Sequence, residues 1–342
     1  MTANDSNGRN VRLEDLAALA GVSTATVSRA LNNSPLVREA TKRRIWQLAR
    51  EHHYAFRPQM PTMLSSASAT ITLAIPTPLG REGSRADPFF MELIGGVGEA
   101  ARAAECDLVI SHVAPQNFDD LSALISSSRT DGVIFLGQSF LHDRFNRLAA
   151  AENRFVVWGA QLPGQEYCSV GSDNIRGGRR ATAHLLRLGR RRIAFFGDRE
   201  APEVRQRYEG YCQAHEQAGV PLDNTLISSV HFEVESAAEA VERLRGGGIQ
   251  FDGLFAASDL IGIGAVRGLM KLGISVPGDV SVVGYDDILL ARYSSPALST
   301  ITQDMATAGR LLVSKLVNST NSYEIPSERL PTELIVRDSC GA

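Results

Sequence analysis

The sequence of 342 residues lacks the features of an exported or membrane-embedded chain. No apolar run approaches the roughly 20 residues that a helix needs to cross a bilayer. The first segment, MTANDSNGRN, has no apolar stretch like that of a secretory signal. The four cysteines are far apart and form no CxxC pair, which argues against a zinc site or a disulfide framework. We therefore expect a cytoplasmic protein with reduced thiols, no metal and no cofactor.

The composition also lacks an excess of basic residues, since the net charge is −3. The charges are unevenly distributed, however. Residues 1–60 hold nine Lys/Arg and five Asp/Glu, a balance of +4, and the remainder has a balance of −7. A basic head on an acidic body is typical of a chain that docks on phosphates with one end only. A solvated basic face would give the same count.

Three short helices are predicted in the first 53 residues. The first runs from Leu13 to Ala20, where apolar residues recur at helical spacing until Gly21 breaks the run. The second follows Ser23, a plausible N-cap, and the third spans about 38–53. Small alanines allow the first two helices to cross closely, and a glycine supplies the backbone freedom of the turn. This spacing predicts a helix-turn-helix.

The second helix has an apolar face and a polar face. Val27, Ala30 and Leu31 are expected to point inward. Hydroxyls near a helix N-terminus suit phosphate contacts, and Arg29 is the one long donor on that face able to reach a guanine edge with two hydrogen bonds. The alternative is a small helical bundle whose polar face is merely solvated. The exposed set is Ser23, Thr24, Ala25, Thr26, Ser28 and Arg29.

After an uncharged stretch at 58–69, which we interpret as a linker, short apolar strands alternate with amphipathic helices. This alternation predicts parallel sheets covered on both faces. About 270 residues is much for one sheet, so two lobes with a ligand cleft between them are expected. The predicted strands are 71–75, 108–113, 132–136, 154–158, 193–196, 253–256 and 280–283. The predicted helices lie near 89–104, 119–127, 174–188, 203–218, 236–245 and 261–272.

The run from Leu13 to Asn32, followed by Ser34-Pro35-Leu36-Val37 and Tyr54, resembles the signature of the lac repressor family. The resemblance extends over nearly the whole chain. It implies a sequence-specific transcriptional regulator with an N-terminal all-α helix-turn-helix domain and an α/β two-lobed domain like the periplasmic binding proteins, with parallel sheets. The boundaries it implies are 1–56 for the DNA-binding domain, 57–69 for a hinge, and 70–342 for the effector-binding and dimerisation domain.

The resemblance also implies roles for individual residues of the DNA-binding domain. Thr24, Ala25 and Arg29 stand where the family reads bases in the major groove. Arg38 departs from the family, which usually has a serine-like helix cap there, so Arg38 is a candidate phosphate contact instead. The residues at positions where the family contacts DNA phosphates are Ser23, Thr26, Ser28 and Asn32, and Tyr54 is a further DNA-binding position.

In the family, the hinge forms a short helix on the operator and inserts an apolar wedge into the minor groove. Met63 matches the wedge position, with Leu64 beside it. The segment departs from the usual Asn-Ala-x-Ala-Arg-x-Leu pattern. Pro58 and Pro61 are tolerable only if the helix starts late, because the first-turn N–H groups lack intrahelical partners anyway. A plain flexible linker is the alternative.

The run from Gly273 to Asp287 resembles the family's effector-core signature and that of periplasmic sugar-binding proteins. By this resemblance Asp286 accepts hydrogen bonds from ligand hydroxyls and Arg207 donates to ligand oxygens. The Asp that often follows the aromatic position is replaced by Gly159 and Ala160, which leaves the particular sugar open. The remaining candidate effector contacts are Phe89, Phe90, Trp158, Ser258 and Met305.

Each effector residue has a structural alternative: core packing for the three aromatic residues, a surface ion pair for Arg207, and a turn for Asp286. A transport protein would need a secretion signal and would leave the helix-turn-helix unexplained. A nucleotide-dependent enzyme is suggested only by Gly96-Val-Gly98, which falls inside a predicted helix, where glycine serves close packing.

We therefore expect a regulator without enzymatic activity that binds double-stranded, pseudo-palindromic operator DNA, with repression as the leading mode of action. The chain ends soon after Leu334 without a leucine-heptad tail, which favours a homodimer over a tetramer. A carbohydrate is the leading effector class, with purines second. Whether the effector releases DNA or promotes binding is left open, as are the operator sequence and the target genes.

Overall fold

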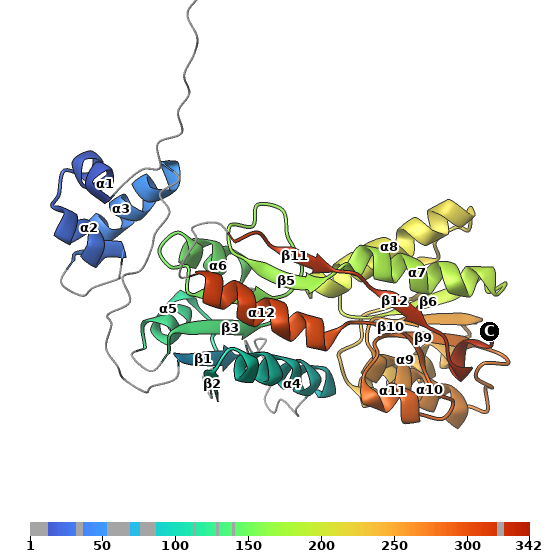
Figure 1. The fold of residues 1–342 in the computed structure, drawn as a ribbon. Coiled ribbons are helices and arrows are strands. Elements are labelled where there is room, and N and C mark those ends of the chain that lie inside the picture. The colour runs from blue at the N-terminus through green and yellow to red at the C-terminus, as the bar shows by residue number, and fades with distance from the viewer. Residues whose placement is uncertain are drawn as a thin grey trace, which may run out of the picture.

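The computed structural model describes residues 13–31, 37–52, 69–75, 87–111, 114–127, 130–138, 141–319 and 325–342. The N-terminal part is a unit of three helices, α1 (Leu13–Ala20), α2 (Thr24–Leu31) and α3 (Glu39–Glu51) (Figure 1). Their apolar faces meet in one small core, which includes Leu16, Val27 and Ile45. The predicted third helix at 38–53 is therefore present, with slightly shorter bounds.

The rest of the described chain forms two lobes, each with a six-stranded sheet. The first sheet has the order β11-β5-β4-β3-β1-β2, and the second has the order β12-β10-β9-β8-β6-β7. All neighbouring pairs are parallel except β10 with β12. Residues 69–158 begin the first lobe with four of its strands: β1 (Ala69–Ala74), β2 (Cys106–Ile110), β3 (Gly132–Leu136) and β4 (Phe155–Trp158). The others are β5 (Ser169–Ser172), β6 (Ile193–Phe196), β7 (Ile227–Ser228), β8 (Gly253–Ala256), β9 (Ser281–Asp286), β10 (Ser299–Thr302), β11 (Glu328–Leu330) and β12 (Glu333–Ile335).

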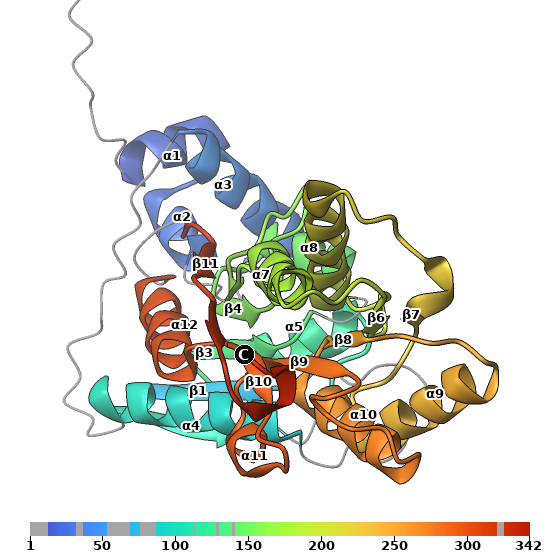
Figure 2. The ribbon, with the colours of Figure 1, turned by 90° about the vertical axis from the view of Figure 1, so that its right-hand side faces the viewer.

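Helices cover both faces of each sheet, as the alternation of strands and helices predicts. In the first lobe α4 and α12 pack on one face, and α5 and α6 on the other. In the second lobe α7 packs against α8, and α9 packs against α10, on opposite sides of the sheet (Figure 2). The helices are α4 (Pro88–Ala103), α5 (Phe118–Ser126), α6 (His142–Ala149), α7 (Asn174–Arg187), α8 (Pro202–Ala218), α9 (Val234–Gly246), α10 (Asp259–Lys271), α11 (Leu289–Tyr293) and α12 (Met305–Ser319). None of these described helices has the length and hydropathy needed to cross a bilayer.

The chain passes between the lobes three times. It leaves the first lobe after β5, returns after β10 to form α12, and passes once more between β11 and β12. The lobes are therefore interleaved in sequence, and the carboxyl ends of their central strands face the junction. In parallel α/β sheets this edge is where ligands bind.

Candidate DNA-binding and effector sites

Ser23 caps the second helix of the N-terminal unit, as predicted. Its side-chain oxygen accepts a hydrogen bond from the backbone N–H of Thr26 at 3.2 Å, and it also lies 2.9 Å from the Thr26 hydroxyl oxygen. Its carbonyl accepts from the N–H groups of Thr26 and Val27. This pairing fixes both hydroxyl groups at the start of α2, beside the backbone donors of a helix N-terminus.

The outer face of α2 presents the side chains that the sequence singles out. Thr24, Ala25 and Arg29 are exposed, and Thr26 and Ser28 are half-buried. The opposite face is closed by Val27, Ala30 and Leu31, which are at most 3% exposed. Helix α2 is thus held by its buried apolar face and exposes Arg29 on the opposite face. Asn32, Tyr54, Met63 and Leu64, together with Pro58 and Pro61, lie outside the described residues.

Arg38 precedes α3 in the position of a helix cap. Its carbonyl accepts hydrogen bonds from the N–H groups of Thr41 and Lys42, at 2.9 and 3.0 Å. Its side chain is exposed. The guanidinium is therefore on the surface of the N-terminal unit, where the predicted phosphate contact would need it.

Arg207 is the centre of the predicted effector site and is only 5% exposed. Its Nε donates to the side-chain oxygen of Asn174 at 2.9 Å, and an Nη donates to the carbonyl of Ala257. The same guanidinium lies 3.5 Å from the Asp286 carboxylate and 3.7 Å from the ring centre of Tyr285. This set excludes the alternative of a surface ion pair, because the guanidinium is buried and bonded on several sides.

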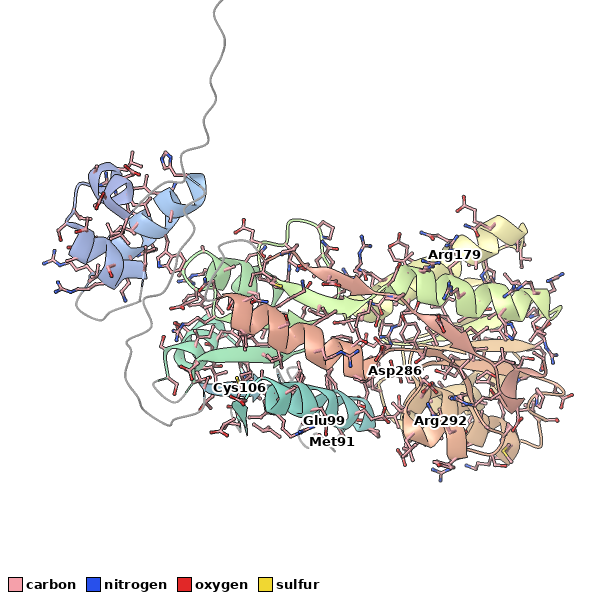
Figure 3. The ribbon with its side chains drawn as sticks, viewed as in Figure 1. Met91, Glu99, Cys106, Arg179, Asp286 and Arg292 are labelled. Carbon is pink, nitrogen blue, oxygen red and sulfur yellow. The ribbon has the colours of Figure 1, made fainter. Side chains whose placement is uncertain are left out.

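Asp286 ends β9 at the junction of the lobes (Figure 3). Its φ of 117° is a conformation that residues with a side chain rarely adopt. Burial raises the pKa of its carboxyl to about 7, and the charge of Arg207 opposes part of this rise. Gln303 donates to the carboxylate at 2.6 Å and in turn accepts from the Ser172 hydroxyl. The chain Asp286–Gln303–Ser172 thus connects the site to two of the crossings between the lobes.

Ser258 is buried and serves as the N-cap of α10. Its side-chain oxygen accepts from the Ile261 N–H at 3.3 Å. The next residue, Asp259, accepts from the Thr300 hydroxyl and from the Ile288 N–H at 2.9 Å. Burial raises the pKa of Asp259 well above its usual range. The contacts of Ser258 are those of a helix cap, and its contact with an effector stays a prediction.

The candidate aromatic residues of the first lobe are in mutual contact. The ring centres of Phe89 and Trp158 are 6.0 Å apart, and those of Phe89 and Phe90 are 5.4 Å apart. Phe89 packs against the cores of both lobes, whereas Phe90 and Met305 pack against the first core only. Trp158 is 5% exposed. These side chains therefore contribute to packing at the junction, and stacking on a ligand stays a prediction for them.

Sequence reasoning missed four polar residues of this junction. Asn174 and Gln303 bond directly to Arg207 and Asp286. Glu203 lies one helical turn before Arg207, a spacing that places both on one face of α8. Asp87 caps α4 by accepting from the Phe89 N–H at 3.0 Å, and its charge raises the pKa of Asp286. The sequence did contain signals for two of them: the i, i+4 spacing from Arg207 for Glu203, and the Asp-Pro helix start for Asp87.

Two hydrogen bonds also join the lobes directly. Gln206 on α8 donates to the carbonyl of Gln161 at 2.9 Å. The Leu289 N–H at the start of α11 donates to the carboxylate of Glu92 on α4 at 2.7 Å. Specific polar contacts thus join α8 and α11 of the second lobe to the first lobe.

Known proteins resemble both parts of the chain. Residues 12–56 match the family described as bacterial regulatory proteins, lacI family, and residues 182–340 match a periplasmic binding protein-like domain. The chain is 32% identical to the HTH-type transcriptional regulator CelR of Thermobifida fusca, over 97% of this chain and 98% of CelR. It is 30% identical to the HTH-type transcriptional repressor CytR of Escherichia coli strain K12, over 96% of each. A solved structure of a CelR–cellobiose complex superposes with a TM-score of 0.69 at 31% identity, over 96% of this chain and 99% of that one.

Proposed function

Because this chain belongs to the lacI family of bacterial regulatory proteins, we propose that it represses transcription from a specific operator under the control of a small carbohydrate. The single observation that carries the proposal is the exposed Arg29 on a helix whose other face is buried. Such a helix can enter the major groove as a rigid element. The cellobiose in the CelR structure supports a sugar as the effector class.

We assign base reading to Thr24, Ala25 and Arg29, and phosphate contacts to Ser23, Thr26, Ser28 and Asn32. Tyr54 is assigned to the DNA interface. Arg29 can donate two hydrogen bonds to a guanine, whereas the short side chains of its neighbours suit methyl contacts. Met63 and Leu64 are assigned to the minor-groove wedge. Regulation in this proposal needs binding alone, in the cytoplasm, without a cofactor or a catalytic step.

We assign the effector to the junction of the lobes. Arg207 and Asp286 would exchange hydrogen bonds with sugar hydroxyls, and Phe89, Phe90 and Trp158 would offer apolar surface to a sugar ring. Ser258 and Met305 complete the proposed contacts. A ligand there can shift the equilibrium between lobe arrangements only as far as it binds one arrangement better than the other.

A homodimer is proposed because several large apolar side chains are exposed on α4 and β2 of the first lobe and on α11 of the second lobe. Strand β2 is at the edge of its sheet, and its Ile110 is 57% exposed, while Tyr293 on α11 is 79% exposed. Figure 3 shows Cys106 on β2 and Met91 and Glu99 on the neighbouring α4. Exposed apolar edge strands invite pairing, and a two-fold dimer would present two readers to a pseudo-palindromic operator. The other exposed apolar members are Met91, Val109, Leu289 and Leu290.

The test is fluorescence anisotropy of the full-length protein with labelled fragments of its own upstream DNA, at physiological salt. We expect one fragment to bind at least a thousandfold more tightly than a scrambled duplex of equal length, about the lower limit for specific recognition. Removal of residues 1–60 should abolish that binding. Equal affinity for every fragment, or binding that survives the truncation, contradicts the proposal.

A further inference from the structure

The second lobe has an open cavity at the edge of its sheet that lies opposite the junction. Its volume is about 370 Å³, within the usual range of small-molecule sites. Ile193, which begins β6, and Leu226, which directly precedes β7, both line it, so the cavity lies at the amino ends of these strands. His215 lines it as well and follows Arg207 on α8 by about 12 Å along the helix axis. The cavity shares no lining residue with the proposed effector site.

Apolar side chains form much of the cavity wall. Ile193 and Leu226 are buried, whereas Leu222 lines the cavity with 44% of its surface exposed. The rings of Tyr211 and His215 are in contact, with their centres 4.3 Å apart, and both residues line the cavity. An aromatic or other apolar body bound here would remove this surface from water, which is favourable.

His215 brings a buried hydrogen-bond acceptor to the cavity. Its side chain is 2% exposed, and its Nδ1 lies 3.1 Å from the carbonyl oxygen of Tyr211. Because a carbonyl only accepts, we assign the ring proton to Nδ1. Burial lowers the pKa of the imidazole, so the ring is neutral at pH 7 and Nε2 is an acceptor. Among the described residues no donor bonds to Nε2, and a ligand hydroxyl would satisfy it.

Arg191 brings a positive charge to the same cavity. Its Nη1 donates to the carbonyl of Leu186 at 2.9 Å, which holds the guanidinium in place and leaves Nη2 without a partner in the described chain. The other two charges of the cavity neutralise each other. The Asp223 carboxylate lies 3.1 Å from the Arg192 guanidinium and also accepts from the Thr225 hydroxyl. A ligand carboxylate would therefore find its charge-assisted partner in Arg191.

We propose that this cavity is a second ligand site and that it binds a small phenolic acid, a benzene ring that carries both a hydroxyl and a carboxylate. The ring lies against the apolar wall, the hydroxyl donates to Nε2 of His215, and the carboxylate accepts from Arg191. The inference goes beyond the proposed function and does not depend on the effector assigned to the junction.

The experiment is isothermal titration calorimetry of the full-length protein with three phenolic acids that differ in length: 4-hydroxybenzoate, 4-hydroxyphenylacetate and 4-coumarate. Each is compared with the analogue that lacks the hydroxyl (benzoate, phenylacetate or cinnamate) and with its own methyl ester, which lacks the charge. We expect at least one phenolic acid to bind about tenfold more tightly than both counterparts, because each counterpart leaves one protein group unpaired.

Two variants assign the contacts. His215→Phe keeps an aromatic ring but removes the acceptor, so the phenolic acid and its analogue without the hydroxyl should bind alike. Arg191→Met keeps the length of the side chain but removes its charge, so the acid and its ester should bind alike. The matched control is Arg187→Met, which changes an exposed arginine outside the cavity and should keep both differences.

Several results would overturn the inference. If none of the three acids binds the wild-type protein, the cavity is not a site for this class of ligand. Equal binding of every acid and its analogue without the hydroxyl, or of every acid and its ester, removes the assigned role of His215 or of Arg191. If both differences persist in both variants, the ligand binds elsewhere. The comparisons within the wild-type protein keep the test valid even if His215→Phe unfolds, and none of these results bears on operator recognition or on sugar binding at the junction.

Discussion

At the scale of single residues, two arginines illustrate opposite uses of the same side chain. Arg29 is exposed on α2, so its fork of donors is available to a partner outside the molecule. Arg207 is buried and bonded to Asn174, Ala257 and Asp286. The planar guanidinium suits both tasks, because it can read a base edge with two bonds or satisfy several fixed acceptors in an interior.

The prediction for Arg29 concerns specificity and not folding. Arg29→Ala should weaken operator binding by about 1–3 kcal/mol and relax the preference at one base pair in each half-site. The unfolding temperature should stay the same, because the side chain is exposed. Anisotropy titrations with operators substituted at each position check this result. A uniform loss at all positions would instead assign Arg29 to phosphate contact.

The prediction for Arg207 concerns both stability and the effector. Arg207→Ala leaves the buried Asp286 carboxylate without its ion pair, which should cost about 3 kcal/mol or more of the free energy of unfolding. Effector binding should be lost, whereas operator binding of the folded fraction persists. Urea denaturation and calorimetry measure the two effects. Arg205→Ala, an exposed neighbour on the same helix, is the control and should change neither by more than about 0.5 kcal/mol.

At the scale of elements, the first lobe depends on the close crossing of α4 and α12. A Cβ atom at Gly96 would lie 2.3 Å from the carbonyl oxygen of Met305, and one at Gly309 would lie 2.2 Å from the carbonyl carbon of Gly96. For Gly96, the prediction that glycine serves close helix packing and not a nucleotide site thus agrees with the structure.

Gly309→Ala should therefore destabilise the first lobe by about 1–3 kcal/mol, the usual cost of overpacking. Gly98→Ala is a matched control, since its new methyl would meet only the Leu108 side chain at 3.8 Å. The control should be neutral or stabilising by up to about 1 kcal/mol, because alanine favours a helix over glycine. The unfolding temperatures of both variants, compared with that of the wild type, test this prediction. Equal destabilisation would show that the crossing tolerates a methyl group.

The strands and helices of the two lobes show where prediction of the fold from sequence succeeded and where it failed. The strands predicted from apolar runs, such as 132–136 and 253–256, have the observed bounds. The predictions missed β5 (Ser-Val-Gly-Ser) and β10 (Ser-Thr-Ile-Thr), because their buried positions are filled by small polar residues. Such strands are held by neighbours on both sides and carry no periodic apolar signal. Helices α6, α11 and α12 were missed as well.

At the scale of the whole molecule, the residues proposed to bind the effector converge only after the chain has crossed between the lobes. Motif and resemblance predicted Arg207 and Asp286, which the structure brings to 3.5 Å. Asn174 and Gln303 could not be predicted from local pattern, because their roles depend on contacts between segments far apart in sequence. Gln303, for example, bonds Ser172 across 131 residues.

The convergence of buried carboxyl groups makes stability depend on pH. Asp286 has its pKa raised to about 7 from 3.8, chiefly by burial, and Asp259 and Glu203 are raised by the same cause. Between these values the folded state holds protons that the unfolded state has released. The contribution of Asp286 to the free energy of unfolding should therefore fall as pH rises from about 4 to 7 and then level off.

Asp286→Asn tests this dependence, because an amide does not titrate. The variant should flatten the decline by up to about 1.4 kcal/mol per pH unit within the window, whatever its stability at any single pH. Asp223→Asn is the control: hydrogen bonds from Thr225 lower the pKa of Asp223, so its contribution is lost only below the window. Urea denaturation of both variants and the wild type, from pH 4 to pH 8, gives the three slopes. If the wild type and Asp286→Asn decline in parallel, the Asp286 carboxyl is ionised in the folded protein throughout, and Arg207 outweighs its burial.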